Sequence, residues 1–80
     1  MTFSYDRLAD VMYVTFERLP NQAYIYVENE SGDILRMDRT TQRVVGITIP
    51  YFLERLKNNK LEVPEIGAVP FNDIAEELAS

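Results

Sequence analysis

Apolar and polar side chains alternate along much of the first fifty residues, and a period of two is the signature of β-strands. The segments that show it are rich in β-branched and aromatic residues, which favour a pleated backbone. Five such segments are expected to be strands: residues 3–5, 11–16, 23–27, 34–37 and 44–49. The first two flank a short polar stretch and therefore predict a β-hairpin, around which the rest of the chain is organised.

Two of these strands carry further information about the sheet. Residues 11–16 are apolar on both faces, which predicts a central strand that is covered on both sides. In the last strand Val45, Ile47 and Ile49 share the face that is expected to be buried. Gly46 lies on the opposite face, where a glycine within a strand indicates a bulge or the close approach of another group.

The period changes after Pro50, which ends the last strand and suits the first turn of a helix. Residues 51–59 then predict a short amphipathic helix. Its apolar residues Phe52, Leu53 and Leu56 are expected to face the sheet.

The remainder of the chain is expected to be extended and then helical. Residues 61–70 contain two prolines and a glycine, which predict an anchored connector. Asn72 is a good N-cap for a final helix over residues 73–79. A helix of about two turns is not stable alone, so it must dock on its own chain or on a neighbour. We therefore divide the chain into a sheet domain with its first helix, residues 1–60, and residues 61–80, which belong to the same domain or to a dimer contact.

Composition limits the fold to one small domain. Eighty residues are enough for one hydrophobic core and not for two. The hydrophobic fraction of 46% is typical of a globular protein. The predicted fold class is α+β, a small antiparallel meander sheet of four to five strands with one or two short C-terminal helices packed on it. A domain of this size buries only about 60% of its unfolded surface, which favours a homodimer that buries more.

The net charge of −5 is concentrated in the C-terminal quarter of the chain. The last twenty residues hold five acids and no Lys or Arg, whereas the eight acids of the first sixty residues balance all eight Lys and Arg. Nucleic-acid binding depends on Lys and Arg that displace the counterions of the phosphates, so this distribution argues against it. It suits solubility or a small basic protein partner.

Two residue types that dominate catalytic chemistry are absent, because the chain has no cysteine and no histidine. Thiol chemistry and disulfides are therefore excluded, which fits a cytoplasmic location. Without a histidine base a serine-type triad cannot form, so we expect no enzyme activity and no cofactor. No apolar segment approaches the length of a membrane span.

A resemblance to a known family covers residues 3–50. It is carried by the opening YDRLADVMYV (residues 5–14), by Asp38 and by the strand VVGITI (residues 44–49), in that order. These segments resemble a family of very small bacterial proteins that is known only as a domain of unknown function. That family has a Tyr-Asp-x-x-x-Asp-x-x-Tyr opening and an Ile/Val-Val-Gly-Ile-Glu-Ile closing strand.

The chain departs from the family pattern in three places. Gln42 stands where a turn glycine is usual, Thr48 stands where Glu is usual, and the pattern ends at Pro50. The resemblance implies a small antiparallel sheet with a helix. Because some members are encoded beside small toxin-like proteins, it also implies an antitoxin role. It carries over no catalytic residue.

Asp6 and Asp10 flank the predicted hairpin turn and are the candidate residues for chemistry. Two neighbouring carboxylates can act as an acid/base pair or hold a hard metal ion. Aspartate is also a standard turn residue, because its side chain accepts hydrogen bonds from nearby backbone N–H groups. The turn role is the simpler interpretation, and a divalent-metal or small-ligand site at Asp6 and Asp10 is the alternative.

A second candidate site is a group of tyrosines and arginines, Tyr24 and Tyr26 with Arg36, Arg39 and Arg43. Such a strand surface can stack single-stranded bases. Acidic residues interleave with these arginines, so the expected role of the tyrosines is instead a face covered by a helix or by a dimer mate.

The C-terminal helix is the candidate partner-binding element, through Phe71, Ile74, Leu78, Glu76 and Glu77. Its apolar side is expected either to enter a groove of a partner or to pack on its own sheet or its own dimer mate. The sequence hypothesis is a non-catalytic interaction protein, antitoxin-like, that binds a small basic partner through this tail or through a sheet edge. The alternatives are a homodimeric scaffold and a ligand-binding role for the hairpin turn.

Overall fold

The computed structural model describes residues 1–20, 23–58, 60–67, 69 and 71–79. The strands in this part of the chain are β1 (Thr2–Asp6), β2 (Val11–Thr15), β3 (Tyr24–Glu28), β4 (Ile34–Asp38) and β5 (Val44–Ile49). They are followed by helix α1 (Phe52–Lys57), the 3₁₀ turn η2 (Pro64–Ile66) and helix α2 (Phe71–Ala79). Each strand lies within about two residues of its predicted bounds, and α2 begins two residues before the predicted start.

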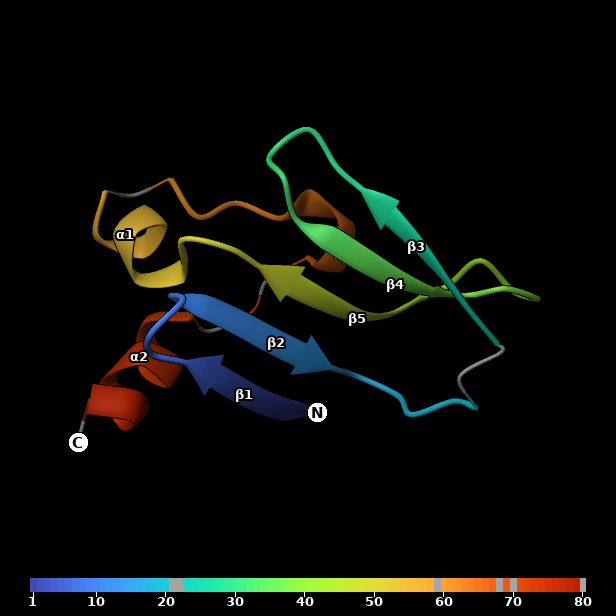
Figure 1. Cartoon of the computed structure of the whole chain (residues 1–80), viewed down its shortest axis with the longest axis horizontal. Coiled ribbons are helices and arrows are strands. Elements are labelled where there is room, and N and C mark those ends of the chain that lie inside the picture. Colours follow the sequence, from blue (N-terminus) through green and yellow to red (C-terminus); the bar gives the residue numbers. More distant parts are fainter. Residues whose placement is uncertain (21–22, 59, 68, 70, 80) are drawn as a thin grey trace.

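The strands form one antiparallel sheet in the order β1-β2-β5-β4-β3. This agrees with the predicted α+β class, and the last three strands form a meander. The sheet departs from chain order at one point, because β5 rather than β3 lies beside β2. Figure 1 shows β5 between β2 and β4, with α1 and α2 near one end of the sheet and β3 at its outer edge.

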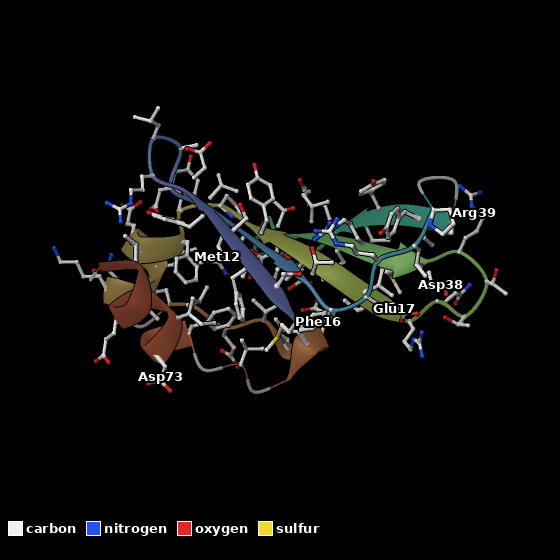
Figure 2. The ribbon with its side chains drawn as sticks, turned by 90° about the horizontal axis from the view of Figure 1, so that it is seen from below. Met12, Phe16, Glu17, Asp38, Arg39 and Asp73 are labelled. Atoms are coloured by element: carbon white, nitrogen blue, oxygen red, sulfur yellow. The ribbon has the colours of Figure 1, made fainter. Side chains whose placement is uncertain are left out.

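One face of the sheet carries the hydrophobic core. Its buried side chains come from the sheet, from both helices and from the connector: Met12, Val14, Leu35, Ile47, Ile49, Phe52, Val63 and Ile74. Figure 2 shows the C-terminal segment on this side of the sheet. Leu56 also packs against the core, whereas Leu53 is 42% exposed, so the prediction that Leu53 faces the sheet was wrong.

The opposite face, called here the outer face, is open. Tyr13 of β2 is 41% exposed and Tyr26 of β3 is 65% exposed. The prediction that residues 11–16 are covered on both sides was therefore wrong. The outer side chains of β2 are Val11, Tyr13 and Thr15, and two of the three carry a hydroxyl group. Such a face can be exposed to water, as one face of an antiparallel sheet often is.

A β-bulge in β5 changes which of its residues face the core. Arg36 pairs with Gly46 and Met37 pairs with Val44, so Val45 is the extra residue on β5. Val44 is partly buried and packs against the main hydrophobic cluster, while Val45 is almost completely buried. The prediction that Val45, Ile47 and Ile49 are buried is confirmed, and the two isoleucines belong to the main hydrophobic cluster.

A glycine within a strand indicates a bulge or the close approach of another group, and Gly46 also shows the close approach. The Arg36 side chain lies across it, with Nη2 2.5 Å from the place where a Cβ would stand. The same Nη2 donates to the Val14 carbonyl oxygen at 2.6 Å and to Thr15 Oγ1 at 3.1 Å. A glycine is needed here because any side chain would displace the guanidinium from these acceptors.

The β4–β5 turn shows how the chain manages without a glycine. Gln42 has a φ of 59°, a left-handed conformation that glycine adopts more readily. The Asp38 side chain supports the turn by accepting from the N–H groups of Thr40 and Thr41 at 2.8 and 3.3 Å. The position where the resembling family has glycine therefore does require a positive φ.

Candidate functional site

Asp10 of the hairpin acts as the cap of helix α1, which lies over forty residues further along the chain. Its carboxylate accepts from the N–H groups of Leu53 at 2.9 Å and Glu54 at 3.4 Å. Its carbonyl oxygen accepts from Phe52 N–H at 3.0 Å. The residue before the helix, Tyr51, provides no side-chain cap. These bonds satisfy N–H groups that a helix start leaves without partners.

Tyr5 completes the surroundings of Asp10 by donating its hydroxyl hydrogen to Asp10 Oδ1 at 2.7 Å. Burial raises the pKa of Asp10, but hydrogen bonds from Leu53 N–H, the Tyr5 hydroxyl and Glu54 N–H outweigh it and leave the pKa below its usual value. Burial, followed by the bond to Asp10, raises the pKa of Tyr5 to about 12. Asp10 is thus held ionised as a structural acceptor.

Asp6 has a local role in the same hairpin. Its Oδ1 accepts from the N–H groups of Leu8 and Ala9 at 3.0 and 3.2 Å. In the part of the chain that the structure describes, no group of three or more acidic, histidine or cysteine residues is placed to hold a metal. The placement of Asp6 and Asp10 supports the turn interpretation, which the long-range capping role of Asp10 extends.

A buried ion pair at the same end of the sheet has no counterpart in the sequence predictions. Asp33 is fully buried, and its carboxylate accepts from Arg55 Nη1 at 2.6 Å and Nη2 at 3.4 Å. Asn29 Nδ2 donates to the same carboxylate at 3.1 Å. The pair joins the β3–β4 turn to α1. A sequence signal is hard to find, because the partners are 22 residues apart in different kinds of element.

The tyrosines of the second candidate site lie on the outer face of β3. The rings of Tyr24 and Tyr26 are 6.3 Å apart and tilted by 45°. Tyr24 is half-buried, and its hydroxyl oxygen accepts from Leu19 N–H at 2.9 Å. Arg39 reaches this strand and donates to the Tyr24 carbonyl oxygen at 3.3 Å. Figure 2 shows Arg39 and Asp38 at the end of the sheet remote from both α-helices.

The other two arginines of that site are engaged elsewhere. Arg36 lies across Gly46 on the outer face, and Arg43 forms an exposed ion pair with Glu17. The structure therefore does not gather the three arginines into one positively charged surface beside the tyrosines. A base-stacking site at these tyrosines would therefore lack the positive charge that binding of nucleic-acid phosphates needs.

The residues predicted to bind a partner through the tail are placed differently from one another. Phe71 packs edge-on against Phe52 with ring centres 5.7 Å apart, and Ile74 is buried in the core. These two side chains therefore serve the chain's own packing. Glu76 is exposed, whereas the side chains of Glu77 and Leu78 lie outside the described part of the chain.

The outer edge of β3 offers unpaired backbone groups. Ala23 and Asn29 bond with the β4 side, since Arg39 N–H donates to the Ala23 carbonyl at 2.7 Å and Asn29 N–H donates to the Asp33 carbonyl at 2.9 Å. Bonding residues alternate along an antiparallel pair. The N–H and C=O groups of Tyr24, Tyr26 and Glu28 therefore point away from β4, and no described strand lies beyond β3.

A groove of about 410 Å³ lies beside this edge, on the core side of the sheet. Val27, Leu35 and Pro64 provide its apolar part, and Val27 is 43% exposed. The remaining lining residues are polar: Glu28, Asn29, Glu30, Ser31 and Glu65. The groove thus combines exposed apolar surface with three exposed carboxylates and no lysine or arginine among its described lining residues.

Comparisons with protein-family models, with curated proteins and with solved structures found no match for the chain. In the part of the chain that the structure describes, no helix is long and apolar enough to cross a membrane. The family resemblance of residues 3–50 remains a prediction.

Proposed function

We propose that the protein is a non-catalytic interaction protein that binds a basic segment of a protein partner at the β3 edge. The observation that carries the proposal is the acidic groove beside an open strand edge, where Val27 is exposed beside Glu30 and Glu65 and the next residue, Glu28, adds a carboxylate on the outer face of the same edge. The proposal keeps the predicted basic partner and moves the contact from the tail to the sheet edge, because Ile74 of the tail is buried.

The charge of the groove favours a basic partner over a second copy of the chain. Pairing two β3 edges would bring Glu28 and its acidic neighbours of both copies together, and like charges on neighbouring strands destabilise a sheet. A cationic segment meets the opposite situation, since complementary charge steers association and excludes wrong partners. An antitoxin that neutralises a small basic protein would use its surface in this way, which is the role that the sequence resemblance implies.

The proposal is tested with a defined probe, the capped heptapeptide Lys-Val-Lys-Val-Lys-Val-Lys, and with its Glu-Val counterpart, by isothermal titration calorimetry. We expect the lysine peptide to bind and the glutamate peptide not to bind. Neutralising the groove by Glu28→Gln, Glu30→Gln and Glu65→Gln is expected to weaken binding about tenfold, since removing each of several close charge pairs costs up to about 1 kcal/mol.

The matched control is the triple variant Glu54→Gln, Asp73→Asn and Glu76→Gln, which removes the same charge from exposed positions outside the groove. It is expected to bind the lysine peptide within about twofold of the parent protein, because charges beyond about 10 Å are screened at physiological salt. Equal losses in the two triple variants would show a general attraction to an acidic protein and would overturn the proposed site.

A further inference from the structure

We infer that the partner segment binds as an additional β-strand alongside β3, with lysine or arginine at alternate positions facing the groove. The inference rests on the proposed function and describes the conformation and residue pattern of the ligand at the same site. It is carried by the direction of the unpaired backbone groups of β3 and by the different chemistry of the two sides of this edge.

The backbone of β3 presents a row of hydrogen-bonding groups to an incoming strand. Tyr26 is the central residue of the strand, and both its N–H and its C=O point outward, as do those of Glu28. A peptide that adds a strand gains main-chain hydrogen bonds there, which is a general mode of peptide recognition. Its side chains then alternate between the groove side and the outer face.

The groove side of the edge suits a long cationic side chain. Val27 and Pro64 present apolar surface, and Glu65 and Glu30 line the same groove. A lysine or arginine can lay its methylene stem on apolar surface while its charged end stays at a polar rim. A purely apolar side chain would leave the carboxylates without a cationic partner, and an acidic one would be repelled.

The outer side of the edge selects for a different residue. Tyr26 is 65% exposed, and its ring stands next to Tyr24 on the outer face. A β-branched or aromatic side chain beside Tyr26 forms a favourable cross-strand pair. The two sides together define a segment with basic residues toward the groove and a β-branched or aromatic residue opposite Tyr26, and Glu28 on the face of Tyr26 adds to the attraction for a basic segment.

Arg39 limits where such a segment can pair. Its guanidinium already donates to the Tyr24 carbonyl oxygen at 3.3 Å, so this acceptor is occupied. The free part of the edge is therefore the half that contains Tyr26 and Glu28, next to the groove. Cationic side chains that cover an edge also prevent unwanted strand pairing.

Backbone N-methylation of the heptapeptide tests strand addition without changing its charge. One peptide carries N-methyl groups on the backbone nitrogens of its three valines. The other carries them on the backbone nitrogens of its last three lysines. In an antiparallel pair the residue opposite Tyr26 shares its face, so with lysines in the groove the valine amides point at β3. We expect methylation of the valines to weaken binding at least about tenfold, since two or more hydrogen bonds of about 1 kcal/mol are lost.

The peptide methylated on its lysines is expected to bind within a few-fold of the unmodified one, because those amides point away from β3. The reverse ranking would still support strand addition, in parallel orientation, because parallel pairing uses the amides of the groove-facing residues. Equal affinities of the two methylated peptides would overturn the inference while leaving the proposed function in place. If the unmodified lysine peptide does not bind at all, the proposed function itself fails.

Discussion

The helical end of the sheet and the β3 edge both carry carboxylates, and they use them in opposite ways. At the helical end Asp10 and Asp33 are wholly engaged by N–H groups and by Arg55. At the β3 edge Glu28 and Glu30 are exposed and line a groove without a basic partner. A carboxylate that already has donors around it stabilises the fold, whereas one left at an open edge is available to a ligand. The carboxylates that remain available to a ligand are therefore the glutamates of the edge and not the paired aspartates of the hairpin.

The largest effect on stability is expected for Asp33→Ala. The change leaves the Arg55 guanidinium largely buried without its carboxylate, and breaking a buried pair in this way costs about 3–5 kcal/mol of the free energy of unfolding. Urea unfolding followed by circular dichroism measures it. Glu17→Ala breaks the exposed Arg43 pair and is the control, with an expected cost below about 1 kcal/mol. Equal costs would remove the distinction between the two kinds of carboxylate.

A smaller loss is expected for Asp10→Ala, which removes the cap of α1 and the acceptor of the Tyr5 hydroxyl. Loss of a helix cap costs about 1–2 kcal/mol. Asp10→Asn keeps an oxygen acceptor and suits the φ of 55° at this position. Its loss of stability should therefore be less than half of the loss caused by Asp10→Ala. The same urea titration measures both, and an Asp10→Ala variant as stable as the parent would contradict the capping role.

The Asp10 contribution should also depend on acid pH. Because the pKa of Asp10 is lower in the folded protein, its ionised form stabilises the fold above the unfolded pKa of about 4. This contribution is lost as the pH falls through the folded pKa. The stability difference between the parent protein and Asp10→Asn is therefore expected to shrink below pH 4. Chemical denaturation at several pH values between 2.5 and 7 checks this, and a difference that stays constant would argue against it.

The smallest effect on stability is expected at the β3 edge. The variant Glu28→Gln, Glu30→Gln and Glu65→Gln should unfold within about 0.5 kcal/mol of the parent, which is the usual range for surface substitutions. A change of this size, measured in the same urea titration, would show that these glutamates contribute little to the stability of the fold. A loss above 1 kcal/mol would mean that they support the fold, as Asp33 does.

The sequence pattern was sufficient for what depends on neighbouring residues. The five strands and two helices follow from alternation, from β-branched runs and from Pro50, and the structure bears out the antiparallel α+β sheet. Gly46 was recognised as a position that requires space. Its partner Arg36 could not be named, because cross-strand pairing brings the two together only once the strand order is known.

What the sequence could not provide are the contacts between distant segments. The insertion of β5 beside β2 leaves no local signal, and for the bulge at Val45 the sequence offered only the neighbouring Gly46, which indicated a bulge or a close approach. The link from Asp10 to Leu53 spans 43 residues. The groove at Glu65 likewise forms only because the connector returns to the β3–β4 turn. The sequence hypothesis named a basic partner and a sheet edge as one possible contact, but it did not name the acidic residues of that edge.

The position of β5 has a consequence for how the chain folds during synthesis. Strands β1 and β2 form one hairpin and β3 and β4 another, and β5 is the strand that joins them. An isolated hairpin is marginally stable at best in water. The central strand of the sheet is also the last to leave the ribosome, so residues 1–43 emerge as two separate hairpins with open edges. The core cannot form before β5 arrives between them, and it is completed by Phe52, Val63 and Ile74, which follow β5 in the chain.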